Sequence, residues 1–475
     1  LVQEIAVQGP SLTVPTPDRG EAPILMDYSS PNIAKPLGIH HILSTVIGQS
    51  LYNLYTFSGY RAIAINHIGD WGTQFGKLFI AHARWGTKPI AEHSIDELLG
   101  LYVRFHKEVD AMPMLEDDAR AVFAKLESGD PEIRAFWSSS VAVTMKAMEG
   151  TYRRLHVTFD EVIGESFYED KMMSIVEEGK QKGVFVPGKD GAPIAPFPEE
   201  EKLPPALVLK GDGSTIYITR DFATVRYRID RWHPQSILYV VDIAQQLHFK
   251  QLFRVIDLLG WEHPHLEHII FGRMNFADGS MSTRMGTIVR LEEVLDEGKR
   301  RAAELIKERG EKIQTDDPDA LAEMMGVGAV VYGVLSQNRL MDMIFDWKKV
   351  LTFEGNSAPY LQYTYARARS VLRKAGTDGD FGVDGTAVTS KEKLLLKQLM
   401  EFRSAVNAAR TEHLPHKVTT YLYTLAQAFN AFYASEPILT AEGSVRDRRL
   451  ALASLTASVL KCGAELLTLR VPERM

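Results

Sequence analysis

The stretch SSPNIAKPLGIHHILST, residues 29–45, places a glycine and two histidines just before an apolar pattern of helical spacing. The free backbone N–H groups and positive dipole at a helix start attract phosphate groups. Gly38 lets a flat base approach the backbone, and a histidine can donate a hydrogen bond to a phosphate oxygen. The turn Gly38-Ile39-His40-His41 is therefore a candidate nucleotide site. The alternative is a glycine-containing helix start with two incidental histidines.

This turn lies between two predicted strands. The apolar run ILMDYSS (24–30) predicts the first strand, and RAIAINHIGDWG (61–72), which ends in polar residues and glycines, predicts the second. From position 41 onward, apolar residues recur at helical spacing until Gly59, which predicts a helix between the strands. Strand, turn, helix and strand form a β-α-β unit, which implies a parallel sheet with its binding site at the strand carboxyl ends.

A second group of strand-like runs follows a long helical stretch. Residues 80–150 are rich in charge and mostly helical in pattern. The three runs after them are STIYITRD (214–221), SILYVVD (236–242) and EHIIFGRM (267–274). Two half-sheets separated by a helical insertion would form one nucleotide-binding domain of the α/β class. Beyond residue 290 the pattern is helical to the end, which predicts a separate all-helical domain.

Composition narrows the class of protein. A chain of 475 residues that is 45% hydrophobic can bury a large core. It has no stretch of the roughly 18 uninterrupted apolar residues that a membrane span needs, and its start lacks the features of a secretory signal. One cysteine, Cys462, allows neither an internal disulfide nor a cysteine-rich zinc site. We therefore expect a cytoplasmic protein without membrane contact, in which any metal is a hard ion brought by the substrate.

The net charge of -7 disfavours a protein coated in basic residues for non-specific nucleic-acid binding. It leaves RNA binding open, because a local basic face on an acidic body can still contact phosphates.

Six segments in order resemble arginyl-tRNA synthetases, which are class I aminoacyl-tRNA synthetases. The resemblance runs from Ser29 to Met475, and members of that family usually carry a further N-terminal domain. The segments are SSPNIAKP, GDWGTQFGKL (69–78), YITRD (217–221), MSTRMG (281–286), PYLQYTYARARSVLRK (359–374) and PERM at the end.

The resemblance implies a Rossmann-type parallel-sheet catalytic domain with a helical insertion, followed by an all-helical anticodon-binding domain. The implied activity is a ligase that attaches L-arginine to tRNA(Arg) through an arginyl-adenylate formed with ATP and Mg²⁺, and members are usually monomers. The corresponding boundaries are a lead-in or domain remnant at 1–23, the catalytic domain at 24–290 with its insertion at about 80–150, a helical connector at 291–350 and the anticodon-binding domain at 351–475.

The resemblance also implies an arginine pocket. Asn32 would lie near the backbone groups of the substrate, Asp221 would pair with its guanidinium, and Tyr217 would pack beside it. Tyr217 and Asp221 share one face if the strand continues that far, and a buried carboxylate that accepts two parallel N–H bonds distinguishes arginine from lysine. A helix N-cap at Asp221 after the strand is the alternative, and it is compatible with that role. Glu165 and Gln245 are further candidates, for which a structural hydrogen bond is an equal alternative.

The first family signature, His-x-Gly-His, is altered in this chain. Gly38 stands where the first histidine belongs, His40 stands where the glycine belongs, and His41 keeps its place. We expect all three to contact ATP, with His40 and His41 in the catalytic step. A side chain at His40 could crowd the adenine, and Gly38 supplies no side-chain donor.

The second signature, Lys-Met-Ser-Lys, reads Ser280-Met281-Ser282-Thr283 and has neither lysine. Met281 and Ser282 are expected ATP contacts. The resemblance implies that Lys35 replaces a missing cation of this loop, although a solvated lysine at a loop end is the alternative. Arg284 is the nearest remaining cation and a second catalytic candidate.

The helical C-terminal part carries the candidate tRNA contacts. Tyr363 and Arg367 are four residues apart in an aromatic and basic run. Unstacked bases are held by aromatic side chains and arginine. Tyr433 and Met475 follow by position in the family pattern, whereas Tyr360 is better explained as a core residue.

Three functions remain from different classes. The first is an arginyl-tRNA synthetase. The second is a catalytically impaired paralogue that binds tRNA without charging it, which the altered first signature favours. The third, a small-molecule nucleotidylyltransferase that shares only the sheet, is disfavoured by the long helical C-terminus.

Overall fold

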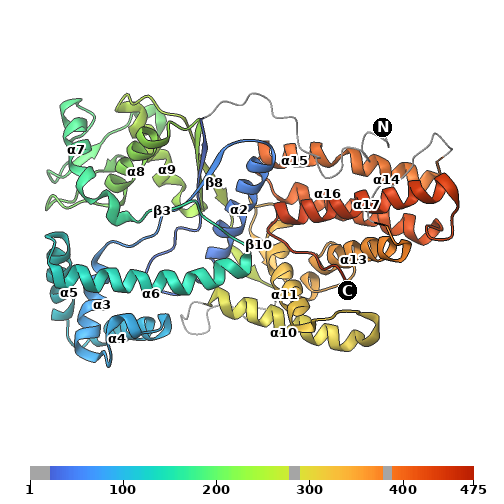
Figure 1. The fold of residues 1–475 in the computed structure, drawn as a ribbon. Helices are drawn as coiled ribbons and strands as arrows, with labels where there is room; N and C mark the ends of the chain where they lie inside the picture. Colours follow the sequence, from blue (N-terminus) through green and yellow to red (C-terminus); the bar gives the residue numbers. More distant parts are fainter. Residues whose placement is uncertain (1–21, 278–288, 378–387) are drawn as a thin grey trace.

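A five-stranded parallel sheet lies at the centre of the N-terminal part of the molecule (Figure 1). The computed structural model describes residues 22–277, 289–377 and 388–475. The strand order is β3-β2-β1-β7-β8, and every pair is parallel. The strands are β1 (Ile24–Asp27), β2 (Ala62–Asn66), β3 (Glu161–Val162), β7 (Ser236–Asp242) and β8 (His265–Phe271).

Alternation along the strands divides the core between the two faces of this sheet. In β1, Met26 packs into the cluster that contains α2 (His41–Phe57), and Leu25 packs into the opposite cluster. That opposite face is covered by α7 (Met172–Gln181), α8 (Tyr217–Trp232) and α9 (Gln246–Leu258). The sheet is therefore the middle layer of an α/β sandwich, as the sequence predicted.

A helical group is inserted between β2 and β3. It comprises α3 (Thr73–Trp85), α4 (Ile95–Val109), α5 (Met114–Glu127) and α6 (Pro131–Leu155). These helices have their own apolar clusters. Helices α3 and α5 approach so closely that a Cβ at Gly76 would overlap the backbone of Ala119.

Smaller elements complete this part of the chain. They are the antiparallel sheet β4 (Val186–Pro187), β5 (Pro193–Ala195) and β6 (Ala206–Leu207), the parallel pair β9 (Met274–Phe276) and β10 (Met343–Phe345), and the 3-10 helices η1 (Ile90–Glu92), η2 (Glu165–Lys171), η3 (Glu199–Glu201), η4 (Ile243–Gln245) and η6 (Gly310–Lys312).

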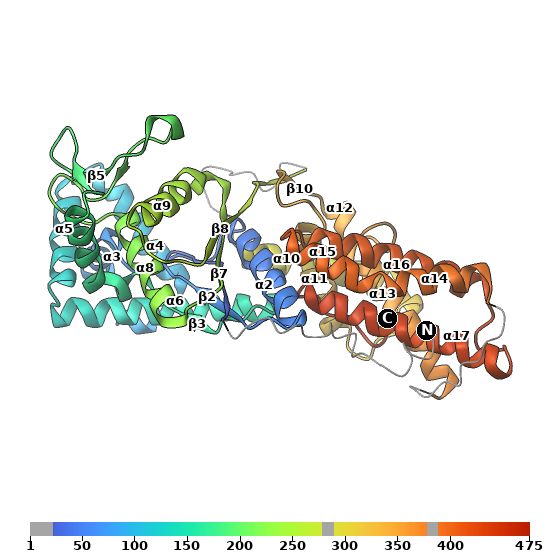
Figure 2. The ribbon, with the colours of Figure 1, turned by 90° about the horizontal axis from the view of Figure 1, so that it is seen from above.

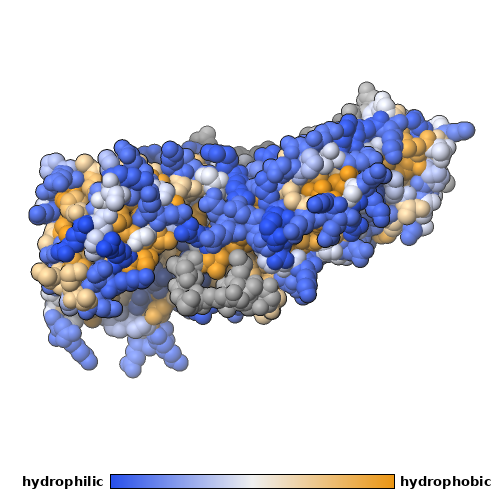
Figure 3. Space-filling view, turned by 90° about the horizontal axis from the view of Figure 1, so that it is seen from below, coloured by the Kyte–Doolittle hydropathy of each residue, from blue (hydrophilic) through white to orange (hydrophobic). Residues whose placement is uncertain are grey.

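The C-terminal part is a bundle of helices that extends away from the sheet, so the molecule is elongated (Figure 2). Helix α11 (Pro318–Leu335) has the length and apolar composition of a membrane-spanning helix. It is mostly buried inside the protein, as is usual for a core helix. Figure 3 shows a face of the molecule that is mainly hydrophilic, with smaller hydrophobic areas among the hydrophilic residues. The helices are α10 (Leu291–Arg309), α11 (Pro318–Leu335), α12 (Trp347–Val350), α13 (Ala358–Ala375), α14 (Ser390–Met400), α15 (Phe402–Thr411), α16 (His416–Ser435) and α17 (Gly443–Leu466).

Two sequence predictions of secondary structure are wrong. STIYITRD (214–221) is not a strand, because α8 begins at Tyr217. Its β-branched residues favour a strand locally, but Ile218, Phe222 and Val225 recur at helical spacing and are buried on one side of the helix. The region beyond residue 290 is also not wholly helical, since β10 pairs with β9.

Candidate functional site

The candidate site lies at the carboxyl ends of β1, β2 and β7. The connections after β1 and β7 leave the sheet toward opposite sides, and ligands of such sheets bind where the strand order reverses. The segments 28–40, 67–72 and 243–248 all begin at this edge. They contain five of the predicted site residues, namely Asn32, Lys35, Gly38, His40 and Gln245.

The SSPNIAKP segment has a strained backbone. Ser29, Ser30 and Ala34 have φ values of 70°, 47° and 66°. These left-handed conformations are unfavourable for residues other than glycine and concentrate at functional sites. The backbone N–H of Ser29 donates to Ser44 Oγ at 2.9 Å, and Ser29 Oγ lies 2.8 Å from the Tyr152 hydroxyl of α6. Helices α2 and α6 thus hold the segment in place.

Asn32 is exposed and packs against Gly69 of the GDWG segment. The backbone N–H of Ile33 donates to the Gly69 carbonyl at 3.1 Å, and the Gly69 N–H donates to the Pro31 carbonyl at 3.0 Å. A Cβ at position 69 would overlap Asn32 Oδ1. The glycine is therefore required by the position of the Asn32 side chain.

The altered turn is the start of α2, where His40 is the exposed residue that precedes His41. The Gly38 N–H donates to His41 Nδ1 at 3.0 Å. The Gly38 carbonyl oxygen also lies 3.2 Å from Nδ1, but a neutral ring nitrogen that accepts cannot donate as well. We therefore assign the proton to Nε2, which has no partner in the described part of the chain.

Both histidines of the turn are neutral at pH 7. Burial, together with the neighbouring His40 ring, lowers the pKa of His41 to about 4, and burial also lowers the pKa of His40. Their ring centroids are 4.0 Å apart. A phosphate at this turn would therefore contact neutral N–H donors and the N-terminus of α2, and it would not be paired with an imidazolium charge.

The turn is bonded to the residues that follow the second signature. The Ile39 N–H donates to the Val289 carbonyl at 2.9 Å, and the Leu291 N–H donates to the Leu37 carbonyl at 2.8 Å. The predicted contacts Met281, Ser282 and Arg284 lie outside the described residues. The described residues that follow them, Val289 to Leu291, lie beside the start of α2.

Lys35 is directed toward the helical insertion. Its ammonium lies over the ring of Tyr102 in α4, 4.7 Å from the centroid. This cation-π contact neutralises no charge. The role of Lys35 at the α-phosphate stays a prediction.

Tyr217 and Asp221 lie in the first turns of α8. The predicted strand is wrong, but residues four apart also share one face of a helix. Asp221 accepts a 2.6 Å hydrogen bond from His248 Nε2 of α9. Its side chain is 28% exposed, so it is not the buried carboxylate that we expected. Tyr217 is 73% exposed, and the Arg220 guanidinium lies 5.9 Å from its ring centroid.

Glu165 is the most perturbed carboxyl group of this edge. Its side chain is 14% exposed and pairs with Arg220 Nη1 at 2.8 Å. Burial raises the pKa of Glu165 to about 7, the Arg220 guanidinium opposes this shift, and the neighbouring Asp221 and Asp70 add to it. Glu165 therefore has one paired guanidinium and two neighbouring carboxyl groups, and a cationic ligand would stabilise its ionised form.

Three further residues of this edge, Arg220, His248 and Asp70, were not predicted from the sequence. Asp70 accepts from the backbone and hydroxyl of Ser166, next to Glu165. Arg220 and Asp70 lie inside segments that carry the resemblance, and His248 lies three residues after Gln245. This proximity in the sequence was the signal that could have indicated them. Gln245 is exposed at the end of η4 and makes no side-chain contact to the others in the described part of the chain.

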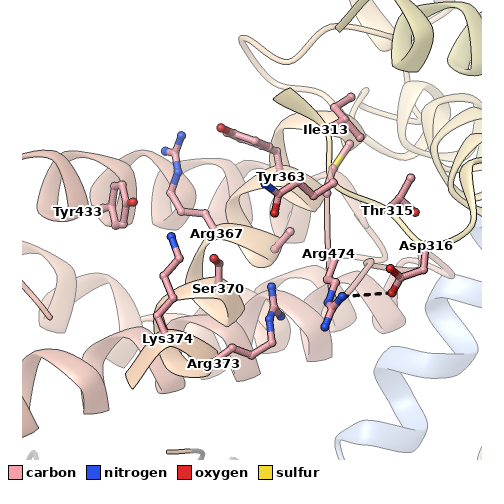
Figure 4. A pocket seen from close by; sticks show the side chains of 13 residues that line it. Ile313, Thr315, Asp316, Tyr363, Arg367, Ser370, Arg373, Lys374, Tyr433 and Arg474 are labelled. Carbon is pink, nitrogen blue, oxygen red and sulfur yellow. Dashed lines mark hydrogen bonds and ion pairs between the residues drawn. The ribbon is translucent and has the colours of Figure 1, made fainter. Parts of the chain in front are cut away.

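The four predicted tRNA contacts converge on one cavity of 710 Å³, called here the C-terminal cavity (Figure 4). The Arg367 guanidinium lies 4.7 Å from the ring centroid of Tyr363 and 5.0 Å from that of Tyr433, and it donates to Asn430. Met475 and the cations Arg373, Lys374 and Arg474 also line this cavity. Tyr360 instead packs against the core, as expected.

Comparison with known families decides which fold this is. The family model described as "tRNA synthetases class I (R), catalytic domain" matches residues 2–347. The chain belongs to the arginyl-tRNA synthetase family. The model described as "DALR anticodon binding domain" matches residues 361–475 of this synthetase.

Several relatives are similar over nearly the whole synthetase. The arginine--tRNA ligase of Clostridioides difficile is 42% identical over 455 residues, which is 95% of this chain and 80% of the relative. That of Chloroflexus aurantiacus is 40% identical over 465 residues, 96% of this chain and 80% of the relative. None of these named relatives is a non-catalytic paralogue, so the comparisons give that alternative no support.

Solved structures share the fold of the synthetase. The Thermus thermophilus arginyl-tRNA synthetase superimposes with a TM-score of 0.84 at 24% identity, covering 100% of this chain and 86% of that one. The Plasmodium falciparum enzyme gives a TM-score of 0.80 at 26% identity, and the match covers 96% of this chain and 78% of that one. The Rossmann-type domain followed by a helical domain is thus the architecture of the family.

Proposed function

We propose that this synthetase forms arginyl-adenylate at the carboxyl edge of its parallel sheet and then transfers the arginyl group to tRNA(Arg). In the first step a carboxylate oxygen of arginine attacks the α-phosphorus of ATP, and pyrophosphate leaves. In the second, a ribose hydroxyl at the tRNA 3′ end attacks the adenylate carbonyl, and AMP leaves. The protein forms no covalent bond, so its tasks are positioning and charge stabilisation.

The observation that carries this proposal is the carboxyl cluster of Glu165, Asp221 and Asp70. Burial and mutual repulsion raise the pKa of Glu165, and a bound cation relieves both. A substrate guanidinium pairs with Asp221, and Tyr217 packs over it. We expect Asn32 to bind the backbone groups of arginine, and Gln245 is a weaker candidate for the same pocket.

ATP occupies the start of α2, where Gly38 gives room and His41 Nε2 donates to a phosphate oxygen. We expect His40 and Lys35 to add donors to the phosphates. Met281, Ser282 and Arg284 lie outside the described residues and stay expected contacts of ATP. In the described residues no group of three or more His, Cys, Asp or Glu side chains could hold a metal ion. We therefore expect Mg²⁺ to be held by the phosphates of ATP.

We propose that anticodon bases bind in the C-terminal cavity. Arg367 is held between two tyrosine rings, and base stacking on such groups stabilises a complex by about 1 to 3 kcal/mol per base. We expect the synthetase to act as a cytoplasmic monomer.

The deciding experiment is aminoacylation with labelled arginine, ATP, Mg²⁺ and total tRNA, with labelled lysine as the control. Asp221→Asn should raise the arginine KM on the order of 10²-fold, because it removes the charge that pairs with the guanidinium. Asp230→Asn, on the exposed side of the same helix, is the matched control and should leave KM unchanged. Binding of tRNA without charging would instead support the impaired paralogue.

A further inference from the structure

A second cavity, of 340 Å³, lies between the end of α6, the first half of α11 and residues 468–470; we call it the α6 cavity. None of its lining residues belongs to the sheet-edge site or to the C-terminal cavity. Its apolar lining includes Met324, Val327 and Leu469. Its polar lining is mainly cationic and includes Arg153, Arg154 and Arg470.

The α6 cavity carries uncompensated positive charge. Arg154 is already paired, because its guanidinium donates to Glu323 at 2.8 Å and to Asp296 at 2.7 Å. Arg153 and Arg470 are exposed and have no ion pair in the described part of the chain. These two guanidinium groups therefore remain available to an anion.

Thr468 supplies an independent sign of a missing ligand. Its side chain lines the cavity and is 4% exposed, yet its hydroxyl has no hydrogen-bond partner in the described structure. A buried hydroxyl without a partner is unfavourable and uncommon in folded proteins. A ligand oxygen in the cavity would satisfy it.

The backbone beside Thr468 is fixed by α13. The side-chain amide of Gln362 donates to the Arg470 carbonyl at 2.9 Å and to the Met324 carbonyl at 3.2 Å. Gln362 directly precedes Tyr363, which lines the C-terminal cavity. The two cavities are therefore linked through consecutive residues of one helix.

We propose that the α6 cavity binds a phosphate group, held by Arg153, Arg470 and the Thr468 hydroxyl, with the carbon body of the ligand on the apolar lining. Arginine forks match phosphate oxygens, and the hydroxyl donates a third bond. The phosphate comes either from the backbone of bound RNA or from a free phosphate ester. Only the RNA source depends on the proposed function.

His156 offers a direct readout, because it lines the same cavity. Burial lowers its pKa, Arg470 lowers it further, and Glu323 opposes them. A phosphate dianion beside it would favour the imidazolium, so its pKa should rise when inorganic phosphate is added. The measurement is a pH titration of the His156 resonance in histidine-labelled protein, assigned with His156→Gln.

Three variants test the named groups. Arg153→Gln and Arg470→Gln should each weaken phosphate binding on the order of tenfold, the usual effect of losing one charged hydrogen bond. Thr468→Val should also weaken it while leaving the unfolding temperature unchanged or higher, since the hydroxyl has no protein partner to lose. Arg61→Gln, before β2 and outside every cavity described, is the matched control.

The salt dependence of tRNA binding separates the two sources. If RNA supplies the phosphate, the slope of log Kd against log salt should fall by about 1 in Arg470→Gln relative to Arg61→Gln. An unchanged slope with a phosphate-dependent shift of His156 would assign the cavity to a free phosphate ester. If phosphate does not shift His156 and the slopes agree, the proposal is overturned, whether or not the protein charges tRNA.

Discussion

The backbone N–H of Ile39 donates to the carbonyl oxygen of Val289 at 2.9 Å, so the start of α2 is bonded to the chain just after the second signature. A second backbone hydrogen bond, from Leu291 to the Leu37 carbonyl at 2.8 Å, joins the same two segments. The altered turn is therefore held to the residues that follow the second signature, although both signatures depart from the family pattern.

Restoring the first signature tests how far its alteration limits the enzyme. The double change Gly38→His with His40→Gly should raise kcat for aminoacylation by up to about 10²-fold, the usual effect of one added donor at the reacting phosphate. The comparison is with His40→Gly alone, which adds room but no donor. Unchanged or lower activity of the double variant would show that His40 already replaces the lost histidine.

Glu165 should make arginine binding depend on pH. Its pKa is about 7 without substrate, and only the ionised form attracts the cation. The arginine KM should therefore rise as the pH falls from 8 to 6, by up to about tenfold. Glu165→Gln should have a higher KM at pH 8 and a flatter profile. If the variant keeps the slope of the wild type, another group controls arginine binding; the KM for ATP serves as the internal control.

Gly69 should affect arginine binding through Asn32. In Gly69→Ala the new methyl group must displace Asn32 Oδ1, so the arginine KM should rise several-fold with little change in tRNA affinity. Gly150→Ala, near the C-terminal end of α6 where a Cβ meets nothing within 4 Å, should leave both constants unchanged. Steady-state kinetics and tRNA binding on the same preparations distinguish the outcomes; equal KM values would remove Asn32 from the pocket.

Arg367 should control tRNA affinity rather than arginine activation. Arg367→Lys keeps the charge but loses the flat guanidinium between two rings, so tRNA Kd should rise about tenfold. Tyr433→Phe keeps the ring and should have a small effect. Fluorescence titration with tRNA(Arg) gives both values. An equal Kd for Arg367→Lys and the wild type would place the anticodon elsewhere.

Sequence patterns located β1, α2, β2 and β7 because each is a long or strongly alternating apolar run beside turn residues. They failed for residues 214–221, where local β-branched composition competes with the spacing of Ile218 and Phe222, and the buried face of α8 decided the outcome. The pattern could place Tyr363 and Arg367 on one face, because four-residue spacing is a local property.

Contacts between distant segments were beyond such patterns. Lys35 lies against Tyr102 of the insertion, and Asp221 is bonded to His248 of the next helix. Neither pair shares a sequence motif. They meet only because the sheet brings its connecting segments to one edge, and that depends on the packing of the whole domain.

The last turn of α6 serves two places at once. The Tyr152 hydroxyl lies 2.8 Å from Ser29 Oγ in the strained segment beside the proposed arginine pocket, and the next residue, Arg153, lines the α6 cavity. The backbones of neighbouring helical residues shift together. A backbone shift of this turn on ligand binding in the α6 cavity would therefore also move the hydroxyl that supports Ser29, and so change the shape of the proposed arginine pocket.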